Sequence, residues 1–129
     1  MTNLAKPFAM HVSSQEAMRD LVIAMRKNLE DLSDFEKENR EAMGSAWVLK
    51  YSGKVPRFVT RAGYSNTAML ESAVLFQSGP AAEAFVTRFP DECIGFHDDL
   101  PAPVSLRTAM EYQKDYVRQV IARLAEFVD

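Results

Sequence analysis

The spacing of apolar residues changes along this chain from a helical period to a period of two. Early in the chain they recur at steps of three and four, which places them on one face of an α-helix: Met18, Leu21, Val22, Met25, Leu29 and Leu32. Between Ala46 and Tyr64 apolar and polar residues alternate instead, as in a strand with one buried face. A chain with both periods is expected to pack helices on a sheet.

The first helix is predicted to begin at Ser13. Glu16 follows Ser13 by three residues, which makes a capping box that satisfies backbone donors at a helix start. A second pair with the same spacing, Ser33 and Glu36, lies where the apolar stripe stops, so a break or bend is expected near Ser33. Gly44 is a suitable end for the helical region.

A β-hairpin with a turn at residues 52–54 is predicted over residues 46–64, and Pro56 favours an edge position for its second strand. If strict alternation continues across the turn, one face carries the core side chains: Trp47, Leu49, Tyr51, Phe58 and Thr60. The other face then carries the basic side chains and two valines: Lys50, Arg57, Arg61, Val48 and Val59. The basic face is expected to lie toward solvent or a partner, and the aromatic face beneath the long helices.

The second half of the chain predicts two more helices and further strands. Residues 73–76 are expected to form a buried third strand, and residues 93–97 a fourth. A short helix should begin at Ser78 or Gly79, end at Pro90 and face the sheet with three residues: Ala81, Ala84 and Phe85. The proline-containing residues 98–104 are expected to be a stiff connector. The final segment has a strong amphipathic pattern: Leu106, Met110, Val117, Val120, Ile121, Leu124 and Val128.

These elements predict a single α+β domain over residues 1–129, with a flexible segment at residues 1–12. Its small, mainly antiparallel sheet of three or four strands is covered by long N- and C-terminal amphipathic helices. The 129 residues are 47% hydrophobic and 26% charged, which suits a folded domain with one core.

Composition also restricts the compartment and the partners. The net charge of -3 argues against a strongly basic nucleic-acid-binding protein. One cysteine, Cys93, cannot form an internal disulfide, which favours a reducing compartment. The chain shows neither a signal-peptide pattern nor an apolar run long enough to span a membrane, so a cytoplasmic protein is expected.

The sequence gives little support to catalysis, a metal site or a cofactor. Cys93 and His97 are four residues apart, about 13 Å along a strand, so a nucleophile pair is disfavoured and a buried structural cysteine is preferred. His97, Asp98 and Asp99 could supply metal ligands, but adjacent strand residues point to opposite faces. We therefore expect no enzyme, no metal and no cofactor, with an enzyme using Cys93 or Asp98 as the least favoured alternative.

Residues 47–89 resemble a short strand-strand-strand-helix module that recurs in small accessory proteins of bacteriophages and other mobile elements. The residues that carry the resemblance are Lys50, Phe58, Gly63, Ala73, Phe76, Ala84 and Phe85. Such modules are usually not enzymes. The resemblance implies a regulator or inhibitor that acts by contact.

Two hypotheses for function follow. The first is a non-catalytic interaction protein with a protein partner, which also forms a homodimer through the apolar residues Met18, Leu21 and Met25. The alternative is contact with phosphate or nucleic acid through four basic residues of the hairpin: Lys50, Lys54, Arg57 and Arg61. Nucleic-acid binding would weaken steeply with salt, whereas protein binding would survive nuclease treatment.

Overall fold

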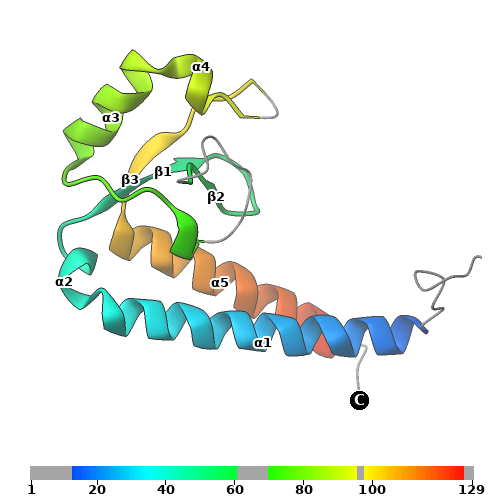
Figure 1. Cartoon of the computed structure of the whole chain (residues 1–129). Coiled ribbons are helices and arrows are strands. Elements are labelled where there is room, and N and C mark those ends of the chain that lie inside the picture. The colour runs from blue at the N-terminus through cyan, green and yellow to red at the C-terminus, as the bar shows by residue number, and fades with distance from the viewer. Residues whose placement is uncertain (1–12, 61–69, 96–97, 127–129) are drawn as a thin grey trace, which may run out of the picture.

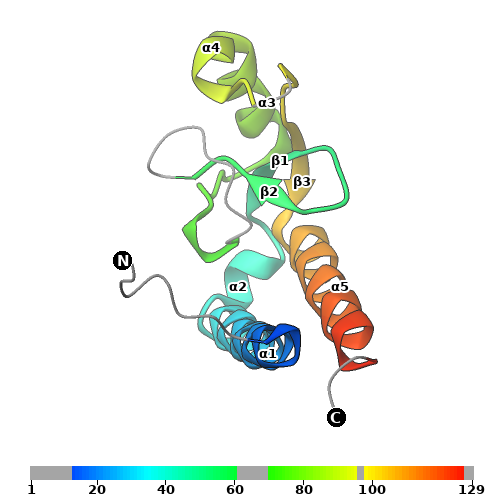
Figure 2. The same cartoon turned by 90° about the vertical axis from the view of Figure 1, so that its right-hand side faces the viewer.

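The computed structural model describes residues 13–60, 70–95 and 98–126, which form three layers (Figures 1 and 2). The sheet lies between a pair of long antiparallel helices on one side and two short helices on the other. The helices are α1 (Ser14–Glu38), α2 (Arg40–Met43), the 3-10 helix η2 (Leu70–Ser72), α3 (Gly79–Arg88), α4 (Pro90–Cys93) and α5 (Leu106–Ala125). The strands are β1 (Trp47–Tyr51), β2 (Arg57–Phe58) and β3 (Ala102–Ser105). The predicted α+β class is confirmed.

The described residues form an antiparallel sheet with strand order β2-β1-β3. β2 lies at an edge, as Pro56 indicated. The other edge strand, β3, comes from the segment predicted to be a connector, so that prediction is wrong. Pro103 lies opposite Leu49 within β3. An edge strand tolerates proline because one row of its backbone groups faces away from the sheet.

Residues 73–76 do not form the predicted third strand. They make two isolated bridges, Trp47 with Phe76 and Thr60 with Ala73. Trp47 and Phe76 exchange backbone hydrogen bonds of 2.9 and 2.7 Å, and the Val74 N–H donates to the Val59 carbonyl at 3.0 Å. This segment shares one side of β1 with β2, which leaves neither of them room for a long ladder. The predicted fourth strand is also absent from the described part of residues 93–97, where Cys93 ends α4.

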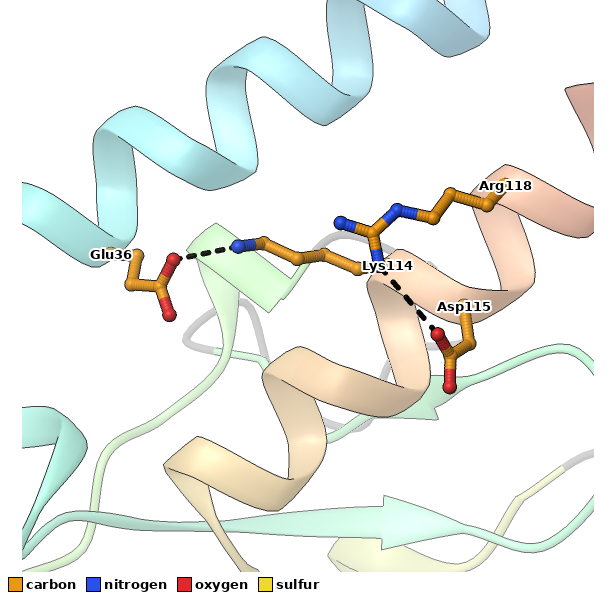
Figure 3. Close-up of polar contacts among 4 residues, drawn as sticks. All are labelled: Glu36, Lys114, Asp115 and Arg118. Atoms are coloured by element: carbon orange, nitrogen blue, oxygen red, sulfur yellow. Dashed lines mark hydrogen bonds and ion pairs between the residues drawn. The ribbon is translucent and has the colours of Figure 1, made fainter.

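Helix α1 is continuous through Ser33, so the predicted break is wrong. It runs to Glu38, and the Asn39 N–H donates to the Phe35 carbonyl at its end. Glu36 does not cap a second helix; its Oε1 accepts a hydrogen bond of 2.6 Å from Lys114 Nζ on α5 (Figure 3). This contact and the packing of Phe35 against the core hold the last turns of α1 in place. The predicted start at Ser13 is confirmed, since its Oγ accepts from the Glu16 N–H at 3.1 Å.

The first core lies between α1, α5 and one face of the sheet. Its fully or nearly fully buried residues are Leu32, Met43, Ala46, Val48, Phe58, Leu70, Ala73, Leu106, Ala109, Met110 and Val117. This packing confirms the amphipathic pattern of α5 as far as the structure describes it, whereas Val128 lies outside the described residues. Gln113 is buried in the same helix with 2% of its surface exposed, and its Oε1 has no hydrogen-bond partner among the described residues.

A second core fills the space between the opposite face of the sheet and α3 and α4. It contains Leu49, Tyr51, Val59, Ala82, Val86 and Cys93. Ser78 caps α3 as predicted, since its Oγ accepts from the Ala81 N–H at 3.1 Å. The predicted inward face of α3 is partly confirmed, because Phe85 packs against this core. Ala84 is exposed instead, and the fully buried residues of α3 are Ala82 and Val86. Both faces of the sheet are therefore covered.

Tyr51 links β1 to the end of α4. Its hydroxyl donates a 2.6 Å hydrogen bond to the Cys93 carbonyl. Burial raises the pKa of Tyr51 to about 12, with smaller contributions from Cys93 and Asp99 and an opposing one from Arg57. Folding therefore favours the protonated phenol.

We expect Tyr51→Phe to lower the free energy of unfolding at neutral pH by about 1–2 kcal/mol, because the Cys93 carbonyl loses a buried donor. The contribution of Tyr51 is fully present below the unfolded pKa of about 10 and is lost as the pH rises toward the folded value of about 12. The difference between wild type and variant should shrink over that interval in urea unfolding. Tyr112→Phe is the control, since Tyr112 is exposed. A difference that stays constant up to pH 12 would contradict this assignment.

Candidate functional site

The hairpin register separates the basic residues that were predicted to share a face. Lys50 lies opposite Phe58, and Tyr51 lies opposite Arg57. Lys50 is therefore on the face of the first core and Arg57 on the face of the second. The prediction failed at the turn, because shifting the register by one residue sends every side chain of the second strand to the other face. It is also wrong that the aromatic face lies beneath the long helices, since Leu49 and Tyr51 pack in the second core.

Arg57 folds back over the turn. One of its guanidinium nitrogens lies 3.7 Å from the position that a Cβ on Gly53 would occupy, and Gly53 has a φ of 123°, which favours glycine. The Arg57 Nε is buried without a hydrogen-bond partner among the described residues. Arg61 lies outside those residues. Arg57 thus starts from the face opposite Lys50, and its guanidinium reaches the turn at Gly53.

Lys50 and Lys54 instead line a groove of about 270 Å³ between the β1–β2 turn and α5. The turn contributes Gly53 and Pro56, and α5 contributes four residues that recur at helical spacing on one stripe: Tyr112, Asp115, Tyr116 and Gln119. We call these eight residues the α5 groove. It joins half of the predicted basic set to two tyrosines.

Lys50 is held in place inside the α5 groove. Its Nζ lies 4.9 Å from the centroid of the Tyr112 ring, a cation–π geometry, and donates to the Tyr51 carbonyl at 3.2 Å. Burial lowers the pKa of Lys50 because it disfavours the charged ammonium. A partly desolvated ammonium interacts more strongly with an incoming anion than a fully hydrated one does.

The rest of the α5 groove is open to a ligand. Lys54 is exposed and makes no ion pair with the described residues, and Tyr112 exposes 52% of its surface. Asp115 is the one carboxylate in the lining. Its Oδ1 lies 3.7 Å from Arg118 Nη1, and both side chains are well exposed (Figure 3). The surroundings of the groove thus carry more positive than negative charge.

Cys93 is placed for packing rather than for reaction. The prediction that it is buried is confirmed, because its side chain is fully buried in the second core. Burial raises the pKa of its thiol, with a smaller contribution from Glu92, so the reactive thiolate is disfavoured. His97 lies outside the described residues, and Asp98 is exposed. Within the described chain, no three His, Cys, Asp or Glu residues group as metal ligands.

The apolar residues predicted as a dimer surface are partly used within the chain. Met25 packs against the first core. Met18 is half-buried, and Leu21 exposes 41% of its surface. Ile23, which was not part of the predicted surface, is 65% exposed. Met18 and Leu21 thus retain apolar surface that could contact a second chain.

The residues of the site on α5 were not predicted from the sequence. Tyr112, Tyr116 and Gln119 are spaced as one stripe of a helix, beside the apolar stripe that was recognised. That spacing was a usable signal. It showed that α5 has a second, polar and aromatic face, but not which strand residues lie opposite.

Comparison with known proteins adds no relative from which a site could be transferred. No protein-family model matches the chain, and neither curated proteins nor solved structures give a match. Among the described residues, no helix has the length and apolar character needed to cross a membrane.

Proposed function

We propose that this chain is a non-catalytic interaction protein that binds an acidic segment of a partner protein in the α5 groove. The observation that carries the proposal is the placement of the Lys50 ammonium over the Tyr112 ring, beside the exposed Lys54. Lysine ammoniums attract carboxylates, and tyrosine is enriched among residues that dominate binding energy. Binding by contact would make the protein a regulator or inhibitor.

The charge of the groove favours a protein segment over a nucleic acid. A strand binder needs a basic track that neutralises several phosphates in succession. The α5 groove offers two lysines and includes Asp115, whereas Arg57 lies on the other face of the sheet. A few acidic side chains of a protein match this set of groups better.

We also propose a compartment, a biological setting and an oligomeric state for the protein. Cytoplasmic action is proposed because the one cysteine is unpaired and buried. A role among phage or mobile-element accessory proteins stays a proposal that rests on the resemblance of residues 47–89. A homodimer through Met18 and Leu21 would leave the α5 groove open, because these residues lie on α1 rather than on the groove-lining elements.

We expect Lys54→Glu to remove the partner in a pull-down of the tagged protein from its native host. The substitution places a negative charge where the acidic segment would bind, and Lys54 is exposed, so folding should be unaffected. Arg26→Glu makes the same charge change on the exposed surface of α1 and is the matched control. The pull-downs are run with and without nuclease and read by mass spectrometry.

A nuclease-resistant protein that is captured by wild type and Arg26→Glu but lost with Lys54→Glu would support the proposal. A partner captured equally by all three proteins would contradict the assignment to the α5 groove. Loss of every partner after nuclease treatment would favour the alternative hypothesis, contact with nucleic acid.

A further inference from the structure

A second pocket, independent of the α5 groove, lies where α1, α2 and α5 meet. Its volume is about 240 Å³, and it is lined by Glu36, Lys37, Arg40, Met43 and Arg107. Lys37 is in the last turn of α1, Arg40 begins α2 and Arg107 is in the first turn of α5. Residues far apart in the sequence thus bring three cations to one place.

The charges in this pocket are not balanced by ion pairs. The one acidic lining residue, Glu36, is bound to Lys114 at 2.6 Å, and Lys114 is largely buried (Figure 3). Lys37, Arg40 and Arg107 form no ion pair with the described residues. All three side chains are exposed. The pocket therefore has an excess of positive charge.

The two arginines reach the pocket from opposite ends of α2. An Arg107 guanidinium nitrogen lies 3.9 Å from the position that a Cβ on Gly44 would occupy, so Arg107 reaches back over the end of α2. Arg40 is at the other end of that single turn. Met43, which is buried, is the apolar residue of the lining.

The chemistry of this set matches a phosphate group. Guanidinium groups offer paired donors that fit phosphate oxygens, and a lysine adds a point charge. The volume is below the roughly 300–1,000 Å³ of pockets for drug-sized ligands, which favours a small anion. A carboxylate is a weaker match for three cations, because it carries a single charge.

We propose that this pocket binds a phosphate group, either inorganic phosphate or a small phosphate monoester, through Lys37, Arg40 and Arg107. Glu36 does not oppose binding, because Lys114 neutralises it. Since the pocket includes the junction of α1 with α2, the bound anion would also tie α1 to the start of α5.

The test is an amide chemical-shift titration of the isotope-labelled full chain at constant ionic strength, with inorganic phosphate and with glycerol 2-phosphate. We expect saturable shifts at residues 37–44 and 106–108. Arg40→Gln and Arg107→Gln should each weaken binding by about tenfold or more, because each removes charged donors. Arg123→Gln, an exposed arginine elsewhere on α5, is the matched control.

Equal affinity for both probes would assign binding to the phosphate group itself, and tighter binding of the ester would show that the pocket also contacts the substituent. Either result supports the proposal. Shifts that do not saturate, that sodium chloride reproduces, or that persist in both arginine variants would overturn it. Lys37→Gln provides a further variant should either arginine change alter the fold.

Discussion

Replacing Phe58 by alanine is expected to lower the free energy of unfolding by about 3–5 kcal/mol. Phe58 is fully buried in the first core, opposite Lys50 and on the same face as Val48. Truncation leaves a cavity between β2 and the long helices that the two-residue strand cannot close easily. A loss of this size is a large part of the roughly 5–15 kcal/mol that stabilises a typical domain.

Phe89→Ala is the matched control for this experiment. Phe89 exposes 38% of its surface and contacts the Phe85 ring at a centroid distance of 5.2 Å. Its truncation should cost about 1 kcal/mol, because part of the ring already faces water. Urea unfolding followed by circular dichroism measures both variants. Similar costs for Phe58→Ala and Phe89→Ala would contradict the register that buries Phe58.

The second large effect concerns binding. Tyr112→Ala is expected to weaken binding of a fluorescein-labelled, glutamate-rich peptide by about thirtyfold, or roughly 2 kcal/mol. The change removes an aromatic contact surface and also the ring beneath Lys50, so that the ammonium loses its fixed position. Fluorescence anisotropy at low and physiological salt gives the affinity of each variant.

Folding should be almost unaffected by Tyr112→Ala, since half of the side chain is already exposed. Leu100→Ala is the matched control, because Leu100 is similarly exposed but lies outside the α5 groove. Unchanged peptide affinity in Tyr112→Ala, in a protein that keeps wild-type stability, would remove Tyr112 from the binding site.

Local patterns predicted the parts of the fold that depend on neighbouring residues. The capping box at Ser13, the cap at Ser78 and the stripe of α5 are each encoded within a few residues, and each is confirmed. The α+β class followed from the change in hydrophobic period. Gly44 also ends α2, as expected.

Tertiary contacts decided the features that the sequence pattern missed. The apolar stripe stops after Leu32, but α1 continues, with Phe35 packed against the first core and Glu36 in contact with Lys114, which is 78 residues away in the sequence. Pro103 argued against a strand, yet pairing with β1 at a sheet edge accommodates it. Neither Lys114, the partner of Glu36, nor β1, the partner of the strand with Pro103, can be predicted from the neighbouring residues.

In the candidate site, too, local patterns predicted some residues and tertiary contacts determined the others. Lys50 and Lys54 were identified from the hairpin, whereas Arg57 was assigned to the wrong face because the alternation does not specify the register across the turn. Tyr112 joined the site because α5 packs beside that turn. Such a contact can be identified only when the positions of the helix and the hairpin relative to each other are known.

The most direct test of the proposed function is an amide chemical-shift titration of the full chain with the glutamate-rich peptide. We predict saturable shifts concentrated in the turn and on one stripe of α5, at Lys50, Gly53, Lys54, Tyr112, Asp115, Tyr116 and Gln119. A lysine-rich peptide of the same length should leave these residues unchanged. Shifts confined to another surface, or no saturable shift at all, would contradict the binding of an acidic segment in the α5 groove.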